Sequence, residues 1–328
     1  MSGVTDNRPL AALSLDMDDL WSYLKTAGDP GWKSHPSFMA LAMPRLLELL
    51  DQYRMGITAF VIGEDVTRPT VRPWLAELVN RGHELGNHSF SHDAAVAYGG
   101  PQQIADELSR VEAVVQQAFG VRLEGYRGPS FSYSRDLLSA LAERAYRYDA
   151  STFPTFLGPL ARWYHRLVSR GSDTDGAGSD QLFGSWAEGF RPLRAYRWQL
   201  ESHSLIELPT TTMPLLRLPV HGTYLHFLAD RSEALALAYL RLALWLCRRT
   251  GTAPVFLLHA SDFLGGDDLA QSSVIPGMRR SGRQKTAFMR RVFEQLTRHY
   301  RVVSMRELAD SLEHDALPLR HPPVDRKP

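Results

Sequence analysis

The chain has 328 residues, of which 44% are hydrophobic and 22% charged, and its formal net charge is +1. This composition is typical of a globular enzyme and excludes a disordered or fibrous chain, while the near-neutral charge excludes the basic surplus of a general nucleic-acid binder. The length fits one catalytic domain of the size of an α/β barrel.

The beginning of the chain and its cysteine content bear on the compartment. The polar segment 1–10, which we take as an N-terminal extension, has no apolar run before a small-residue cleavage site. No stretch reaches the roughly 18 apolar residues needed to cross a bilayer. Cys247 lies among leucines and alanines, which predicts a buried thiol and no internal disulfide. We expect a cytoplasmic protein with at most peripheral contact at the inner face of the membrane.

Strand-like and helix-like patterns alternate from residue 11 onward. Residues 11–19 form an apolar strand pattern that runs into acidic residues. Pro44 then opens a helical pattern to residue 53, at the position where the missing N–H of proline is harmless. Further strands and helices are predicted in turn at 57–63, 71–81, 83–89, 102–119, 125–127, 135–145 and 146–150.

The second half of the chain keeps this alternation. Strands are predicted at 205–209, 254–259 and 300–304, and helices at 232–249 and 283–299. About eight strands with interposed helices predict a parallel, barrel-like sheet in one domain, residues 11–313. An insertion at about 152–197 and the segment 265–282 interrupt the pattern, and connections of that length are typical of lids or binding loops. The proline-rich residues 314–328 predict a flexible tail.

Two histidines four residues apart follow the strand predicted at 83–89. In His88-Ser-Phe-Ser-His92 both imidazoles can face one point if the segment forms a helical turn, and this spacing suits a divalent metal ion. Two histidines at this spacing also occur by chance on solvated helices. The pair alone therefore leaves the metal site open.

Three carboxylates lie at the end of the first predicted strand, where Asp16, Asp18 and Asp19 are interrupted only by Met17. Carboxylates clustered in this way repel one another unless a cation or an arginine neutralises them. An ion such as zinc accepts a carboxylate oxygen beside two imidazole nitrogens and keeps positions for water and substrate. The competing interpretation is an acidic loop that is solvated at a strand end.

Four ordered segments resemble the motifs of the NodB-homology polysaccharide deacetylases, the carbohydrate esterase family 4 type. These segments are Ser14-Leu-Asp-Met-Asp-Asp19, Gly82-His-Glu-Leu-Gly-Asn-His-Ser-Phe-Ser-His92, Tyr126-Arg-Gly-Pro-Ser-Phe131 and Leu257-Leu-His259. The resemblance extends over roughly residues 10–310. It implies a single-domain α/β fold, an irregular (β/α)7–8 barrel, one divalent metal ion held by an Asp-His-His set, and hydrolysis of N- or O-acyl groups, mostly on aminosugars.

The resemblance also implies a role for each matching residue. The implied metal ligands are Asp18, His88 and His92, and the implied catalytic residues are Asp16 as general base, Arg127 as the group that holds this base ionised, and His259 as general acid. The backbone N–H of Ser130 is the implied oxyanion donor. The implied ion is zinc, with cobalt, nickel and manganese as alternatives. It would activate the attacking water and polarise the acyl oxygen.

The acidic motif departs from the commonest family pattern of two adjacent aspartates, because Met17 separates Asp16 from Asp18. Some members use the separated Asp-x-Asp form, so we favour Asp16 as base and Asp18 as ligand. The alternative is Asp19 as ligand with Asp18 as base.

Arg127 and His259 also have ordinary structural explanations, because an arginine can brace a loop and a histidine that ends an apolar strand can be a core residue. The joint motif pattern favours the catalytic roles. Asp149 and Asp262 are candidates for tuning the acid histidine, and His83 is expected to serve the fold rather than the metal.

Two runs mix bulky apolar residues with arginines, 153–170 and 234–249. Basic, aromatic-bearing segments can lie in a membrane interface, although we expect 234–249 to pack on the barrel with its arginines extended to solvent. The preferred substrate is an N-acylated sugar or glycoconjugate carrying an acetyl or formyl group. It could be lipid-linked, similar to the undecaprenyl-phosphate-bound sugars of the family's deformylases. A soluble biosynthetic aminosugar is the next choice.

Two other functions are open. One is hydrolysis of a non-sugar C–N bond, as in the allantoinase-like branch of the same superfamily. The other is a binding protein that kept the barrel and lost catalysis. This last function is disfavoured because candidates for the base, the ligands, the arginine and the acid are all present.

Overall fold

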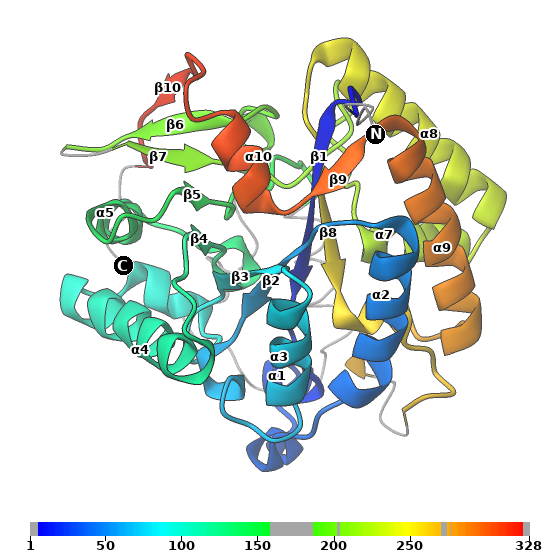
Figure 1. Cartoon of the computed structure of the whole chain (residues 1–328), viewed down its shortest axis with the longest axis horizontal. Coiled ribbons are helices and arrows are strands. Elements are labelled where there is room, and N and C mark those ends of the chain that lie inside the picture. The colour runs from blue at the N-terminus through cyan, green and yellow to red at the C-terminus, as the bar shows by residue number, and fades with distance from the viewer. Residues whose placement is uncertain (1–5, 158–185, 202–203, 270–273, 276, 324–328) are drawn as a thin grey trace, which may run out of the picture.

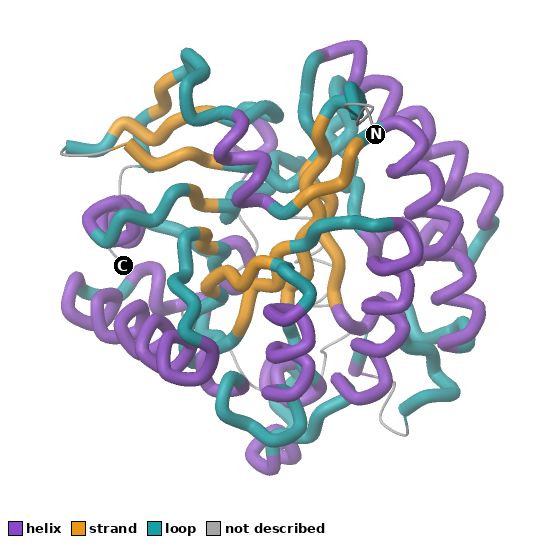
Figure 2. The backbone as a smooth tube through the Cα atoms, viewed as in Figure 1, coloured by secondary structure: helices purple, strands orange, loops and turns teal. Residues whose placement is uncertain are grey.

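Most strands lie at the centre of the molecule with helices around them, and the remaining strands lie at its upper left edge (Figure 1; Figure 2). The structure is a computed structural model that describes residues 6–157, 186–201, 204–269, 274–275 and 277–323. Among these residues, no helix is both long and apolar enough to cross a membrane.

Parallel strands form the wall of the barrel in the order β7-β5-β4-β3-β2-β1-β8. Their bounds are β1 (Leu10–Asp16), β2 (Thr58–Val61), β3 (Glu84–Asn87), β4 (Gly125–Tyr126), β5 (Tyr148–Asp149), β7 (Ser204–Glu207) and β8 (Val255–His259). β1 is buried from Ala11 to Asp16, as expected of a strand covered on both faces. Its register pairs Asp16 with His259. The carboxyl ends of these strands therefore bring chemically active residues together.

Two hydrogen bonds rather than a strand pair close the barrel. Beyond β7, the Thr211 backbone N–H donates to the Val255 carbonyl at 3.1 Å, and the Val255 N–H donates to Thr211 Oγ1 at 2.6 Å. The irregular single-domain barrel predicted from the sequence is confirmed, with this seam between β7 and β8 as one irregularity.

The strand predicted near residue 300 has a different place. β9 (Arg301–Val303) pairs in parallel with the first half of β1 only, from Leu10 to Ala12. It therefore supports β1 from the end opposite the carboxyl edge.

Two strands were not predicted. β6 (Tyr196–Gln199) runs antiparallel to β7, and β10 (Leu319–Arg320) pairs in parallel with β6. The tail expected to be flexible thus contributes a short strand to the sheet, because β6 offers it an open edge. Most of the insertion predicted at 152–197 lies outside the described residues. Its end forms a short 3-10 helix, Trp186–Phe190, before β6 begins.

Helices cover the outside of the barrel (Figure 1). They are α1 (Leu20–Thr26), α2 (Met39–Tyr53), α3 (Arg72–Asn80), α4 (Pro101–Phe119), α5 (Arg135–Glu143), α7 (Gly222–Ala229), α8 (Glu233–Thr250), α9 (Gly282–His299) and α10 (Met305–Ser311). α8 begins where the Ser232 hydroxyl accepts from the Leu235 N–H, and it ends at Gly251 with a left-handed φ of +65°. Cys247 of α8 is buried as predicted, and burial raises the pKa of its thiol to about 12.

The start of α2 differs from the prediction. The helix begins at Met39, and Pro44 lies inside it rather than at its first turn. Met39 and Met43 are buried in the core, so the apolar face extends one turn further back than the pattern after Pro44 indicated. Pro44 lies on the exposed side, where the carbonyl that it leaves without a partner can reach water.

Candidate active site

One ligand atom from each of Asp18, His88 and His92 meets at the carboxyl end of the barrel. Asp18 follows β1, and the two histidines follow β3. Asp18 Oδ1 lies 3.0 Å from His92 Nε2 and 3.5 Å from His88 Nε2. The three atoms all lie within 4.8 Å of one another. The structure therefore brings together the three residues that the sequence suggested as metal ligands.

The two histidines do not lie in the helical turn that their spacing suggested. The segment after β3 is an irregular loop, in which Ser89 and His92 have left-handed φ values of 64° and 51°. Such backbone costs roughly 1–3 kcal/mol at a non-glycine residue and must be held by its surroundings. Asn87 Oδ1 accepts from the Ser89 N–H at 2.9 Å, and Ser89 Oγ accepts from the His92 N–H at 3.0 Å.

Glu107 of α4 holds the loop that follows β3 and carries both histidines. Its carboxylate accepts from the Phe90 N–H at 2.8 Å, the Ser91 N–H at 3.2 Å and the Ser91 hydroxyl at 2.8 Å. Sequence reasoning missed this residue, because a glutamate in an amphipathic helix is ordinarily a solvated side chain. Its burial is visible only in the structure.

The donor set fits a divalent metal ion. His88 Nδ1 lies 2.7 Å from the Arg127 carbonyl, which directs Nε2 of the buried ring toward Asp18. Asp18 Oδ1 is buried and has no hydrogen-bond partner among the described residues. Burial works to raise the pKa of Asp18, but His92 and His88 outweigh it and hold that pKa well below its usual range. An ionised carboxylate with two imidazole nitrogens suits zinc and similar ions.

Asp19 is turned away from the histidines. Its Oδ1 accepts from the Leu20 N–H and the Phe38 N–H, both at 2.8 Å, so it caps α1. Burial raises the pKa of Asp19 to about 6. This geometry favours Asp18 over Asp19 as the ligand.

Asp16 and Arg127 form a buried ion pair beside the ligand cluster. Arg127 Nη1 donates to Asp16 Oδ1 at 2.7 Å and to Ser14 Oγ at 2.9 Å, and Nε donates to the Ala150 carbonyl at 3.2 Å. The guanidinium carbon lies 4.4 Å from the centre of the Phe60 ring. Arg127 therefore orients the Asp16 carboxylate and compensates its charge.

His259 ends β8 next to Asp16 and has a partner that the sequence did not reveal. Its Nδ1 lies 3.2 Å from Thr223 Oγ1, which donates to Asp262 Oδ1 at 2.9 Å. Asp262 Oδ2 accepts from the His259 N–H at 3.0 Å. The hydroxyl thus connects the histidine ring to the aspartate that we had considered as its tuning group.

Asp149, the other candidate for tuning His259, has different partners. It is paired in register with Glu207 of β7, and Ser151 Oγ donates to its Oδ1 at 2.6 Å. Both carboxyl groups are fully buried, and burial raises both pKa values. Asp149 therefore belongs to a buried acid pair in the barrel wall.

Ser130 lies in a short 3-10 helix, Pro129–Phe131, directly after Arg127 and Gly128. Its φ of 53° is left-handed, and so is that of Phe131 at 60°. Gly128 has no room for a side chain, because a Cβ there would lie 1.9 Å from the Ser132 carbonyl oxygen. The tight turn exposes Ser130 at the edge of the site.

A row of rings leads from this turn to the acid candidate. Phe131 stacks on Phe153 with ring centres 4.9 Å apart, and Phe153 meets His221 edge-on at 5.8 Å. The His221 ring lies 6.4 Å from that of His259. Burial and the neighbouring His259 lower the pKa of His221 to about 3, so it is neutral at physiological pH.

Comparison with known families addresses the membership that the motifs suggested. Residues 29–148 match the model of the polysaccharide deacetylase family, a span that includes both histidines and Arg127. Over these 120 of its 328 residues the chain is similar to the polysaccharide deacetylases. The resemblance inferred from the motifs is thereby confirmed.

Relatives within this family match part of the chain. A peptidoglycan deacetylase from Helicobacter pylori is 27% identical over 146 residues, which are 43% of this chain and 49% of that protein. A Gibberella zeae protein described as peptidoglycan deacetylase-like is 28% identical over 33% of this chain and 31% of its own length. The chain thus spans half or less of the length of these relatives.

A solved structure agrees with the family fold over nearly the whole chain. A Mycobacterium smegmatis protein of the polysaccharide deacetylase type superposes with a TM-score of 0.63 at 19% identity. The match covers 98% of this chain and 96% of that one. At this identity the likeness establishes the shared barrel and nothing about the substrate.

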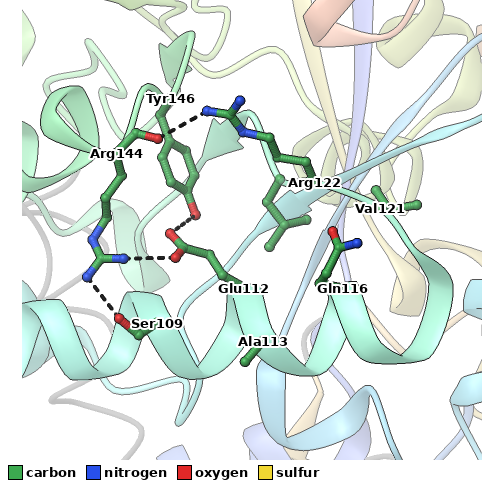
Figure 3. Close-up of a pocket in the computed structure, with 9 residues that line it drawn as sticks. Ser109, Glu112, Ala113, Gln116, Val121, Arg122, Arg144 and Tyr146 are labelled. Carbon is green, nitrogen blue, oxygen red and sulfur yellow. Dashed lines mark hydrogen bonds and ion pairs between the residues drawn. The ribbon is translucent and has the colours of Figure 1, made fainter.

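A separate pocket of about 470 Å³ lies between α4 and the segment that follows α5, and Figure 3 shows its lining. Arg144 Nη1 donates to Glu112 at 2.8 Å, and the Tyr146 hydroxyl donates to the same carboxylate at 3.2 Å. Asn87 Nδ2 donates to the Tyr146 hydroxyl at 2.8 Å. None of the family motif residues lines this pocket. Its Tyr146 hydroxyl supports Asn87, whose Oδ1 in turn accepts from Ser89 in the histidine loop.

Proposed function

We propose that the protein is a metal-dependent hydrolase that removes an N-acyl group, acetyl or formyl, from an aminosugar. The observation that carries the proposal is the juxtaposition at one end of the barrel. The Asp18, His88 and His92 ligand atoms converge there, and Asp16 and His259 lie beside them in register on adjacent strands. Metal-dependent amide hydrolysis needs a base, an acid and a metal site close together, and all three candidates lie at the carboxyl end of the barrel.

The chain's own residues have distinct parts in this reaction. Asp16, oriented by Arg127, accepts the proton of the attacking water, and His259 donates a proton to the leaving amine. The backbone N–H of Ser130 stabilises the oxyanion. When bound by the Asp18 cluster, a divalent ion such as zinc, cobalt, nickel or manganese supplies Lewis-acid polarisation of the acyl oxygen.

The surroundings of the site support a sugar substrate. Phe131, Phe153 and His221 offer apolar ring faces and edges beside His259, where the carbon face of a sugar ring can pack. The Helicobacter pylori relative is a peptidoglycan deacetylase, which favours an N-acetylated aminosugar in a polymer or glycoconjugate.

We extend the proposal to a lipid-linked aminosugar at the cytoplasmic face of the membrane, with a soluble aminosugar as the next choice. The aromatic and arginine-rich run 153–170 motivates this extension. Most of that run lies outside the described residues, so the sequence pattern alone supports it.

The first experiment combines metal content with acetate and formate release from a panel of N-acyl aminosugars, both free and lipid-linked. The purified protein should release acyl groups in a reaction that chelation abolishes and added zinc restores. The Asp18→Ala/His88→Ala variant should bind no metal and release nothing, whereas the exposed His314→Ala/Asp315→Ala variant should match the parent protein.

The outcomes separate the alternatives. Bound metal with no release from any sugar, but with hydrolysis of cyclic amides or ureides, would replace the proposal with a non-sugar C–N hydrolase. Release that survives removal of the metal would reject the role of the Asp18 cluster.

A further inference from the structure

The outer face of α8 carries a row of exposed apolar side chains. Leu235, Leu242 and Trp245 are 54%, 46% and 55% exposed, and the exposed Ala238 lies between them. Their spacing of three, four and three residues places all four on one side of the helix. Single exposed leucines are ordinary on a protein surface, whereas a row that follows a helix marks a binding surface. We call these four residues the α8 stripe.

The opposite face of α8 is already used for packing. Its buried residues are Ala236, Leu237, Leu240, Ala243, Leu244 and Cys247. α8 contacts α7 and α9 along its inner side and lies at the rim of the molecule (Figure 1). The sequence led us to expect 234–249 to pack on the barrel with its arginines in solvent. The structure confirms the packing of one face and reveals the unpartnered second face.

Three exposed arginines flank the α8 stripe. Arg241, Arg248 and Arg249 are exposed, and the Arg249 guanidinium carbon lies 5.9 Å from the Trp245 ring centre. In the part of the chain that the structure describes, none of these three arginines forms an ion pair. The one acidic residue of α8, Glu233, is engaged by two arginines outside the helix.

More positive charge gathers at the carboxyl end of α8. α9 ends with Arg298 and His299, and the side chains of Arg248 and Arg298 both act on His299. Burial and these two cations lower the pKa of His299. The apolar row is therefore bordered by exposed arginines, Arg241, Arg248, Arg249 and Arg298, although the chain as a whole has a net charge of +1.

We infer that the α8 stripe and its flanking arginines form a contact surface for an anionic lipid bilayer. Apolar side chains of an amphipathic helix can enter the boundary between headgroups and acyl chains, while arginines reach the lipid phosphates. Trp245 is the residue type that favours this boundary.

Charge favours a bilayer over a second copy of the chain. In a symmetric dimer through this face, the same surface of both subunits would meet. Arg241, Arg248 and Arg249, which have no ion pair within the described ranges, would then face a like-charged set, which opposes association. Lipid phosphates supply the missing negative charge. This surface lies outside the active site, so the inference goes beyond the proposed hydrolase and does not depend on it.

The test is co-sedimentation of the full chain with vesicles of mixed phosphatidylglycerol and phosphatidylcholine, compared with phosphatidylcholine alone. We expect binding to the anionic vesicles that weakens as salt is raised. Arg248→Gln/Arg249→Gln should weaken binding roughly 30-fold, since each arginine near an anionic surface contributes about 1 kcal/mol. Leu242→Gln/Trp245→Gln should also release the protein from the vesicles.

Matched variants control for charge and apolarity. Arg54→Gln/Arg72→Gln removes two exposed arginines that have no ion pair among the described residues, and Leu41→Gln/Leu319→Gln removes two exposed leucines elsewhere. Both should bind as the parent protein does. Thermal unfolding of every variant shows whether it is folded, and hydrolysis of a soluble aminosugar should be unchanged in the α8 variants.

Fluorescence of Trp245 distinguishes insertion of this residue into the bilayer from vesicle binding by another surface of the protein. Trp245→Leu keeps the apolar surface, so it should retain vesicle binding but lose the fluorescence quenching by lipids with brominated acyl chains. Equal binding to anionic and neutral vesicles, or quenching that does not depend on Trp245, would overturn the inference. Absence of binding to anionic vesicles would also overturn it. In that case a dimer that Leu242→Gln/Trp245→Gln dissociates would identify a second copy as the partner.

Discussion

Arg127 is a fully buried cation that is compensated by Asp16, Ser14 and the Ala150 carbonyl. Removing two opposite charges from water is costly, so such a pair contributes little net stability even when its geometry is good. Its value here is orientation, since the Asp16 carboxylate can accept a proton only from a fixed position. The same burial makes the pair sensitive to the loss of one member.

We predict that Arg127→Met lowers the free energy of unfolding by about 3–5 kcal/mol at pH 7, because Asp16 would remain as an uncompensated buried charge. Denaturant unfolding measures this loss. Arg147→Met is the control, since Arg147 is exposed and pairs with the exposed Asp310, and its loss should stay below about 1 kcal/mol. Similar small losses in both variants would show that Asp16 does not need its partner.

Thr223 is a positioning residue for the proposed acid. Thr223→Val removes the hydroxyl between His259 and Asp262, and we predict a roughly ten-fold lower kcat with little change in KM, the effect of one lost hydrogen bond of about 1.4 kcal/mol. Thr223→Ser should restore kcat. Steady-state kinetics on the released sugar decides the matter, and a fall that serine does not rescue would point to packing of α7 instead.

The meeting of Asp18, His88 and His92 at one point could be predicted because each follows a strand within a short motif. Asp18, His88 and His92 need no long-range information beyond the meeting of strand ends at one edge. Thr223 and Glu107 were missed for the opposite reason. Thr223 lies 36 residues from His259, and Glu107 lies 16 residues from Ser91, and neither spacing is a recognisable pattern.

Among the elements, α4 holds the ligand loop through the Glu107 carboxylate. We predict that Glu107→Gln weakens zinc binding 10–100-fold, the usual cost of losing a group that orients a ligand, because an amide cannot accept all three hydrogen bonds of the carboxylate. Competition with a chelator measures the affinity. Asp106→Asn, on the neighbouring exposed position of the same helix, should leave it unchanged. Equal affinities in both variants would remove Glu107 from the metal site.

The helices with clear polar and apolar faces were predicted within a few residues, as α4, α8 and α9 illustrate. α7 was not predicted, because its sequence, Gly-Thr-Tyr-Leu-His-Phe-Leu-Ala, has no charged face and is only eight residues long. α2 was started too late, because Pro44 was interpreted as a first-turn residue. In each case contacts with the rest of the molecule decide the helix.

At the scale of the whole molecule, the buried pair of Asp149 and Glu207 couples folding to pH. The pKa of Glu207 is well above its usual range because of burial and the charge of Asp149. Above about pH 4, the unfolded chain releases both protons, while the folded pair keeps one until the pH reaches the raised pKa. The folded state then binds more protons, so the free energy of unfolding falls as pH rises through this window.

We predict that Asp149→Asn reduces this slope by up to about 1.4 kcal/mol per pH unit, because an amide can donate to Glu207 without requiring a shared proton. Denaturant unfolding between pH 4 and the alkaline limit of folding tests it, with the exposed Asp315→Asn as control. An unchanged slope would show that the pair does not retain the proton.

The barrel could be predicted from the alternation of strands and helices, because many residues contribute to that pattern. The closure of the barrel could not be predicted. It consists of two hydrogen bonds between Thr211 and Val255, and single contacts of this kind produce no periodic pattern in the sequence. The addition of β10 from the tail was missed for the same reason, since two exposed residues form it.

The seam has a consequence for how the barrel can widen. At the catalytic end, the first turn of α7 lies against β8, where a Cβ on Gly222 would come within 3.0 Å of the Leu258 side chain. Outward displacement of α7 would widen this side of the barrel and leave the pairs between β1, β2 and β3 intact. Hydrogen exchange should be faster at the Thr211 amide than along β1. This result would show that the side of the barrel with His259 and Thr223 opens locally more often than the side with the metal-ligand candidates.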